Sequence, residues 1–229
     1  MDHPLDRPLW NALTGRLSEA ALGDAHAVRI DPEVGVFAAA ADASPDSVAA
    51  LAALCRAHPG AGLVELEGGP MDGVLPTRVE IISRNPCLQM ICEALTPAPE
   101  DDGLEVVVLG DADAAEMLAL ATLTKPGPFR PRTHRLGGFI GVRRDGRLAA
   151  MAGRRLRVEG HTELSGVCTH PDFRGHGLAT ALSRRVVAAI LAEGETAFLH
   201  AYATHEATVA LYESLGFHAR ARVTYTVLA

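Results

Sequence analysis

Residues 174–179, with the sequence Arg-Gly-His-Gly-Leu-Ala, have the types and spacing of a binding site for a phosphorylated ligand. They follow a turn at Pro171 and open a predicted helix that runs from Gly177 to about Leu191. A helix that starts in such a loop points free backbone N–H groups and the positive end of its dipole at one spot. Gly175 and Gly177 carry no Cβ, so a ligand can approach the backbone closely. The loop therefore predicts a phosphate or pyrophosphate site.

The segments around this loop have the patterns of the elements that must position it. Residues Thr162–Thr169 are mostly apolar or small and predict the strand before the loop, and the helix after it has one apolar face. An Asp145-Gly146 turn predicts a hairpin upstream. Further strands are expected at Leu104–Leu109, Gly138–Arg143, Arg147–Gly153, Ala197–Ala203 and Phe217–Leu228, and further helices begin at Asp111 and His205. This order indicates an α/β fold with a mixed sheet and helices on both faces.

The first hundred residues predict helices and strands but contain no group of residues with an evident chemistry. Ser44, Pro45 and Asp46 have the order of a helix start, with Ser44 as the N-cap. The other expected elements are a helix in Pro4–Leu22 and strands at Ala25–Ile30, Val34–Ala40, Gly62–Leu66, Arg78–Ser83 and Asn85–Leu95. The proline- and acid-rich stretch Thr96–Gly103 predicts a boundary between domains at residues 1–98 and 102–229.

A second proline-rich stretch, Pro126–Pro131, cannot form a helix or a central strand. It lies between a predicted helix and the strands that follow. We interpret it either as a wall of a substrate pocket or as a rigid surface connection.

The composition narrows the class of protein. Of the 229 residues 48% are hydrophobic, enough for a sizeable core, and the net charge of −7 argues against a general nucleic-acid binder. No apolar run approaches the roughly 20 residues that span a bilayer, and the polar N-terminus is unlike a signal peptide. The four cysteines form no Cys-x-x-Cys pair, and the histidines show no metal-ligand spacing. We expect a cytoplasmic protein that binds no metal and no membrane.

Two motifs, in order, make the chain from Leu104 to Leu228 resemble the GNAT (Gcn5-related) N-acetyltransferase family. The family's acyl-CoA motif, [RQ]-x-x-G-x-[GA], matches residues 174–179, after a strand that ends in His-Pro at 170–171. The second motif, Leu-Tyr-Glu-Ser-Leu-Gly-Phe, occupies residues 211–217. The run GVCTHPDFRGHG at 166–177 looks most like the FR47-like branch of the family.

The resemblance implies the GNAT acyl-CoA N-acyltransferase fold and an N-acetyltransferase with acetyl-CoA as co-substrate. Its acceptor would be a primary amine, on a small molecule or on a peptide or protein, that attacks directly in a ternary complex. The strand before the loop would separate from its neighbour and pair with the pantetheine arm. The residues expected to hold acetyl-CoA are Val167, Cys168, Thr169, Arg174, Gly175, His176, Gly177, Leu178, Ala179 and Thr180. The Cys168 side chain itself is expected to be small and buried rather than a nucleophile.

The resemblance also assigns two catalytic roles. Tyr212 occupies the general-acid position, where a phenol with a pKa near ~10 stays protonated and can protonate the departing thiolate; a packed aromatic on a helix face is the alternative. Glu163 lies where some members place a glutamate that accepts the amine proton through water; a solvated glutamate at a strand end is the alternative. His134, His161 and Ser165 are possible substitutes for Glu163, and Tyr225 is a reserve for Tyr212.

Two features depart from the family pattern. His205 stands where the family often has an asparagine that helps to hold the pantetheine. A further hundred residues precede the matched region, and we interpret them as a partial or degenerate GNAT-like lobe that shapes the acceptor pocket or forms a homodimer face.

Two other functions are compatible with parts of the sequence. A non-catalytic acyl-CoA-binding sensor or regulator would keep residues 174–180 but tolerate the loss of Tyr212, which is present. A Rossmann-type nucleotide binder would use the same loop, but the hairpin in front of the motif replaces the first βα unit that such a fold needs.

Overall fold

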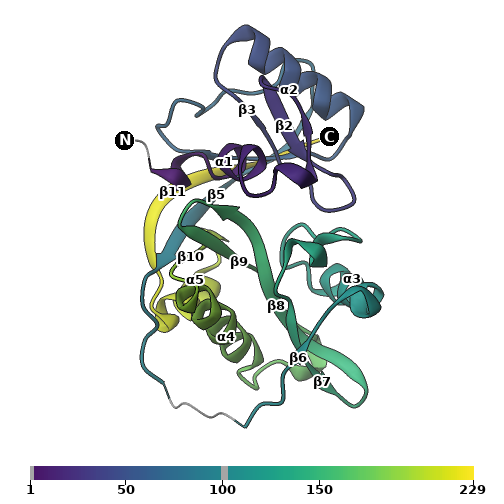
Figure 1. The fold of residues 1–229 in the computed structure, drawn as a ribbon, viewed down its shortest axis with the longest axis vertical. Coiled ribbons are helices and arrows are strands. Elements are labelled where there is room, and N and C mark those ends of the chain that lie inside the picture. Colours follow the sequence, from purple (N-terminus) through teal and green to yellow (C-terminus); the bar gives the residue numbers. More distant parts are fainter. Residues whose placement is uncertain (1–2, 99–102) are drawn as a thin grey trace.

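The computed structural model describes residues 3–98 and 103–229, which form two lobes connected by two long strands (Figure 1). Eight strands form a mixed sheet in the order β4-β11-β5-β10-β9-β8-β7-β6, and three form a small sheet in the order β1-β2-β3. The bounds are β1 Ala21–Gly23, β2 Ala27–Ile30, β3 Ala38–Ala40, β4 Gly62–Leu66, β5 Ile81–Cys92, β6 Val107–Val108, β7 Ile140–Arg144, β8 Arg147–Val158, β9 His161–Thr169, β10 Thr196–Tyr202 and β11 His218–Leu228.

Helices cover both faces of the larger sheet, which confirms the predicted α/β fold. Helix α3 packs against one face of β8 and β9, while α4, with α5 beside it, packs against the other (Figure 1). The helices are α1 Pro8–Thr14, α2 Pro45–Ala57, α3 Ala114–Thr124, α4 Leu178–Ala192 and α5 Glu206–Leu215, with 3-10 turns at Pro4–Asp6, Ser18–Ala20, Asp111–Asp113, Thr133–Leu136 and Pro171–Phe173.

Several predicted elements differ in extent from the structure, among them the strand expected at Arg147–Gly153, which continues to Val158 as β8. The helix expected in Pro4–Leu22 is limited to α1, because Gly15 takes φ −116° and ψ −112°, a conformation that ends the helix. The two strands expected between Arg78 and Leu95 are one strand, β5, which runs through Pro86. Pro86 lies just outside the part of β5 that pairs with β10, so its missing N–H removes no bond from that pairing. The strand expected at Leu104–Leu109 is only two residues long.

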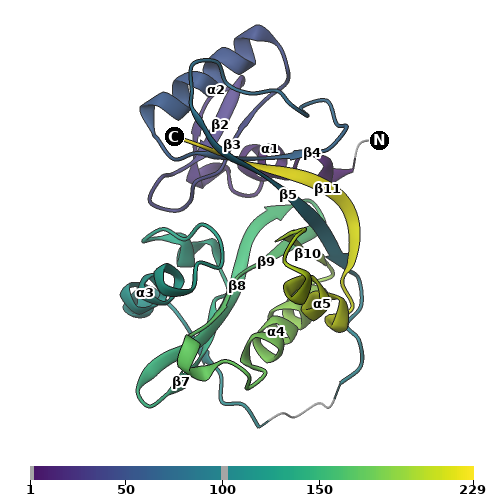
Figure 2. The ribbon, with the colours of Figure 1, turned by 180° about the vertical axis from the view of Figure 1, so that it is seen from behind.

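Strands β5 and β11 cross between the lobes. Although β5 belongs to the first hundred residues, it lies between β10 and β11, and β11 lies between β5 and β4. The two strands pair antiparallel from His218 opposite Ile91 to Leu228 opposite Ile81. Figure 2 shows both passing from one lobe to the other. The boundary expected between residues 98 and 102 lies outside the described residues, and the larger sheet contains strands from both sides of it.

The strand order repeats on the two sides of the β5–β11 pair. On one side, β9 and β10 are parallel and are joined through α4. On the other side, β3 and β4 are joined through α2, and a parallel bridge links Phe37, just before β3, to Gly62 of β4. Antiparallel strands follow outward in each case, β8 and β7 on one side and β2 and β1 on the other. A partial copy of one lobe would have this order.

The two lobes differ at the start of the helix that joins the parallel strands. In the first lobe Ser44 accepts a hydrogen bond from the Ser47 N–H and so caps α2, as the sequence predicts. Arg7 donates hydrogen bonds to the carbonyl oxygens of Ala40 and Ala41, in the loop region before α2. In the first lobe, side chains of the protein thus bind backbone N–H and C=O groups near the start of α2.

Glu65 on β4 is a buried carboxyl group in the same lobe. Burial raises the pKa of Glu65 to about 7, and the positive charge of Arg7 opposes this only in part. A carboxyl with a higher pKa in the folded state holds its proton more tightly there than in the unfolded chain. Its contribution to stability is therefore fully present below about pH 4.5 and is lost as the pH rises through 7.

The variant Glu65→Gln should not show this loss. Above pH 8 we expect its free energy of unfolding to exceed that of the wild type by about 3 kcal/mol, with the two values converging below pH 4. Urea unfolding at several pH values, followed by Trp10 fluorescence, measures the difference. Glu67→Gln, at a more exposed residue two positions along, is the control and should change stability by about 0.5 kcal/mol or less at every pH. A pH-independent effect of E65Q would contradict the prediction.

Candidate active site

Strands β9 and β10 run side by side for three residues and then separate. Their parallel pairing joins His161–Glu163 to Thr196–Phe198. Beyond Glu163, β9 continues along β8 and β10 continues along β5, and within the described residues the edges that face each other have no strand partner. These edges carry backbone N–H and C=O groups that an extended ligand chain can bind.

Gly166 bends β9 inside this opening. It has φ +64°, and the register between β9 and β8 shifts from Cys168 opposite Met151 to Ser165 opposite Gly153. A Cβ at Gly166 would lie 2.7 Å from the ring of Phe139. Only glycine fits both the backbone conformation and the space, so this bulge is built into the path of β9.

The predicted phosphate-binding loop has an open side at the start of α4. Gly175 and Gly177 have φ +79° and +71°, and a Cβ on either would meet no atom within 4 Å. No side chain caps α4, in contrast to α2. Arg174 and His176 are exposed beside the loop. Free N–H groups, a positive helix end and open space suit the pyrophosphate that the sequence predicts here.

A cavity of about 330 Å³ lies in the opening between the two strands. Residues 164–167 of β9 and 199–202 of β10 line it, together with Tyr212 of α5 and the loop at 124–128. Pro126 and Pro128 form part of one wall, in agreement with one of the two interpretations of that loop. The far end reaches the crossing strands and the first lobe, at Phe37, Val64, Cys87, Val223 and Tyr225.

Tyr212 lies on α5 and lines the cavity beside Val167 of β9. Its ring packs edge-on against Phe217 with 5.7 Å between the centroids. Burial raises the pKa of Tyr212 to about 12, and the nearby Cys168 and Glu163 add to the shift. The phenol is therefore protonated throughout the physiological range and can act as a proton donor toward the opening.

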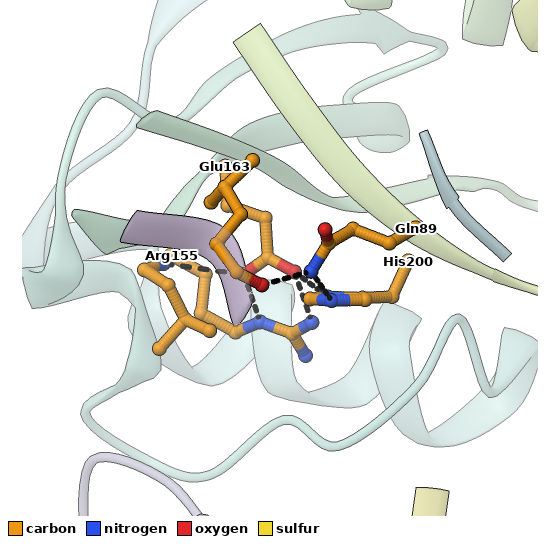
Figure 3. Close-up of polar contacts among 6 residues, drawn as sticks. Gln89, Arg155, Glu163 and His200 are labelled. Atoms are coloured by element: carbon orange, nitrogen blue, oxygen red, sulfur yellow. Dashed lines mark hydrogen bonds and ion pairs between the residues drawn. The ribbon is translucent and has the colours of Figure 1, made fainter. Parts of the chain in front are cut away.

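Glu163, the last residue of β9 that pairs with β10, is fully buried and does not line the cavity. Arg155 of β8 binds both of its oxygens, through Nε at 2.8 Å and Nη2 at 2.7 Å, and His200 Nδ1 lies 2.8 Å from Oε1 (Figure 3). Burial alone would raise the pKa of Glu163, but Arg155 and the hydrogen bonds of Arg155 and His200 lower it to about 2. The carboxylate is consequently a very weak base.

Gln89 of β5 sets the orientation of His200. Its amide nitrogen lies 3.3 Å from His200 Nε2 (Figure 3). The same nitrogen donates to the Leu5 carbonyl at 2.9 Å, while the Gln89 side-chain oxygen accepts from Arg220 at 2.7 Å. With Oε1 bound to Arg220, the amide N–H must donate to Nε2, so His200 carries its proton on Nδ1 and donates it to Glu163. Arg220 in turn pairs with Asp6.

The remaining predicted residues occupy different places. Val167 and Ser165 line the cavity, as do Tyr225 and His205, the residue that precedes α5.

Three other predicted residues lie away from the cavity: Cys168 is buried against α3, His134 pairs with Asp111, and His161 packs against His3. Burial raises the pKa of the Cys168 thiol to about 11, as suits a structural cysteine. Leu178 is buried at the start of α4, with Ala179 and Thr180 after it, and Thr169 ends β9.

Sequence reasoning missed Arg155, His200 and Gln89. One signal was available for Arg155, because counting back from the hairpin turn at 159–160 places it almost opposite Glu163 on β8. No local signal identifies His200 or Gln89, which reach Glu163 through strand pairings that join distant parts of the chain.

Glu163→Gln should lower the free energy of unfolding by about 3–5 kcal/mol, because it leaves the buried Arg155 without a counter-charge. The double variant R155M/E163Q should lose less than E163Q, since no unpaired charge remains. Urea unfolding at pH 7 measures both. The exposed pair of Arg147 with Asp172 provides the control, where Arg147→Gln should cost about 0–1 kcal/mol. A loss in E163Q no larger than that in R147Q would contradict the ion pair.

Within residues 3–98 and 103–229 there is no group of three or more His, Cys, Asp or Glu side chains placed to hold a metal ion. No helix in the same residues has both the length and the apolar character needed to cross a membrane.

A family model described as FR47-like protein matches residues 139–227, which include both separating strands, the loop before α4 and helix α5. A comparison with curated proteins gave no match.

Solved structures resemble the whole chain. A GNAT-family protein from Novosphingobium aromaticivorans is 46% identical, with a TM-score of 0.89 over 100% of this chain and 99% of that chain. Two others share the fold: a GCN5-related N-acetyltransferase from Kribbella flavida (TM-score 0.62, 21% identity, 97% and 95% covered) and a GCN5-related N-acetyltransferase-like protein from Streptococcus suis (TM-score 0.53, 14% identity, 91% and 82% covered). Identity of 46% along the full length, with the FR47-like match over the site, shows that this chain belongs to the GNAT family of acetyltransferases.

Proposed function

We propose that this protein is an N-acetyltransferase that moves the acetyl group of acetyl-CoA to a primary amine by direct attack in a ternary complex. The observation that carries the proposal is the separation of β9 and β10 beside a cavity lined by Tyr212. A thioester placed along β9 would have its reacting carbon in that cavity, next to a proton donor.

The residues around the opening suit coenzyme A. The free edge of β9 at Val167, Cys168 and Thr169 can pair with the amide groups of the pantetheine arm as an added strand would. Residues 174–180 offer the uncapped start of α4 to the pyrophosphate. Acetyl-CoA supplies the acetyl group as a thioester, and the backbone N–H groups of β9 are candidates to polarise its carbonyl oxygen.

The acceptor and Tyr212 then complete the transfer. The amine nitrogen forms a bond to the carbonyl carbon, the carbon–sulfur bond breaks, and the sulfur takes the phenolic proton of Tyr212. The proton released from the nitrogen passes to water, which returns one to Tyr212. We assign Glu163 a positioning role, because it holds Arg155 and His200 and does not line the cavity.

Gly177→Glu should weaken acetyl-CoA binding at least 100-fold, because a carboxylate would stand where the pyrophosphate is expected. Isothermal titration with acetyl-CoA measures the affinity. Gly160→Glu is the matched control, since Gly160 also has a positive φ and open space but lies at the far end of β9. Equal binding by G177E and G160E would exclude the loop as the pyrophosphate site.

Tyr212→Phe removes only the phenolic hydroxyl and should lower kcat by about 10²–10⁴-fold. Its Kd for acetyl-CoA should stay within threefold of the wild-type value. The readouts are release of CoA thiol over a panel of primary amines and isothermal titration. Unchanged turnover would reduce Tyr212 to a packing role. Acetyl-CoA binding without thiol release by the wild type, with every amine, would instead favour a non-catalytic acyl-CoA-binding protein.

A further inference from the structure

The cavity has a second part that the proposed path of acetyl-CoA does not use. It lies between the crossing strands and the first lobe, and we call the part lined by Phe37, Val64, Arg155, Tyr202 and Tyr225 the acceptor end. These residues come from the segment before β3 and from β4, β8, β10 and β11. The acceptor end is therefore assembled from both lobes, directly beyond the point where β9 and β10 separate.

Arg155 is held in one orientation at this end. Its Nε and Nη2 bind the two oxygens of Glu163, and its guanidinium carbon lies 4.6 Å from the centre of the Phe37 ring. Nη1 has no hydrogen-bond partner among the described residues, and Figure 3 shows this terminal nitrogen without a dashed line. The Arg155 side chain is 12% exposed and lines the cavity. The Nη1 amino group of a guanidinium fixed in position thus remains available to a ligand.

The Lys and Arg side chains that line the cavity, Lys125 and Arg155, face no acidic side chain in its lining among the described residues. Lys125, an exposed residue of the proline-rich loop, also lines it, and no aspartate or glutamate does so within the described residues. Glu163, the carboxylate that binds Arg155, does not line the cavity and already accepts from Arg155, His200 and the Leu156 N–H. Because a charge in a poorly solvated site is stabilised by an opposite charge, the cavity favours an anionic group on the ligand.

We propose that the acetyl acceptor is a small primary amine that also carries a carboxylate, and that Arg155 Nη1 and Lys125 bind this carboxylate. The inference rests on the proposed acetyl transfer and specifies its substrate class. Phe37, Tyr202 and Tyr225 surround the body of the acceptor, so an apolar or aromatic side chain is accommodated. The volume of about 330 Å³, part of which the thioester end needs, suits an amino acid.

Matched sets of acceptors test the carboxylate directly. L-Phenylalanine, its primary amide and phenethylamine form one set, and L-leucine, its amide and 3-methylbutylamine form another. Thiol release from acetyl-CoA is compared at equal concentrations of neutral amine, since the three amines of a set differ in pKa. We expect kcat/KM for the amino acid to exceed that for its amide and its amine at least 20-fold.

Variants then assign the preference to residues. R155M/E163Q removes the cation without leaving a buried unpaired carboxylate, and should lower the ratio of kcat/KM for the amino acid to kcat/KM for its amide at least tenfold. Lys125→Gln should lower the ratio of kcat/KM for the amino acid to kcat/KM for its amide by a smaller factor, about two- to fivefold. Arg154→Gln is the control, because Arg154 precedes Arg155 on β8 but pairs with Glu193 and does not line the cavity.

A binding measurement separates this inference from the proposed function. Titration of each acceptor into the protein saturated with CoA requires no turnover, and the amino acid should bind at least tenfold more tightly than its amide, with the difference lost in R155M/E163Q. Equal binding and equal turnover of acid and amide, or a preference for a peptide amine without a nearby carboxylate, would overturn the carboxylate site and leave acetyl transfer intact. Selective binding without turnover would instead contradict acetyl transfer and retain the carboxylate site.

Discussion

A single buried carboxylate lies at the point on which the rest of the site depends. Glu163 is the last residue that joins β9 to β10, and it accepts hydrogen bonds from β8 through Arg155 and Leu156 and from β10 through His200. Gln89 extends this network to β5, and Arg220 extends it to β11. An isolated charge at this depth would be unstable, so every donor is required. The network ties together the strands whose divergence creates the cavity.

The crossing of β5 and β11 gives the two ends of the cavity different origins. The end beside Val167 and Tyr212 is built from residues between 162 and 217, which are close in sequence. The acceptor end needs Phe37 and Val64 from the first lobe and Tyr225 from the last strand, and these meet only because β11 pairs with both β4 and β5. The end of the cavity proposed for acetyl-CoA is therefore local in the chain, whereas the proposed acceptor end depends on contacts across nearly its whole length.

The two lobes have the same strand order but different polar groups at corresponding positions. In the first lobe, Ser44 caps α2 and Arg7 binds the carbonyl groups at the end of β3. In the second, α4 has no side-chain cap, and the loop at 174–177 is open. The first turn of α2 thus has a side-chain cap in the first lobe, whereas the start of α4 in the second has none and is open to a ligand.

Local sequence patterns were enough to predict most of the elements and to propose the site for acetyl-CoA. Apolar periodicity, cap residues and turn signals are local, so they predicted α2, β4, β7, α4 and α5 close to their observed bounds, and the start but not the end of β8. The same locality made residues 174–180 and Tyr212 recognisable. The long-range pairings of the fold are needed to place β5 in the larger sheet, to bury Glu163 as an ion-pair partner, and to make Arg155 a lining residue of the cavity. The pairings of β5 join residues 105 to 147 positions apart, and the pairing of β9 with β10 joins residues 35 apart; pairings at such distances leave no periodic signal in the sequence.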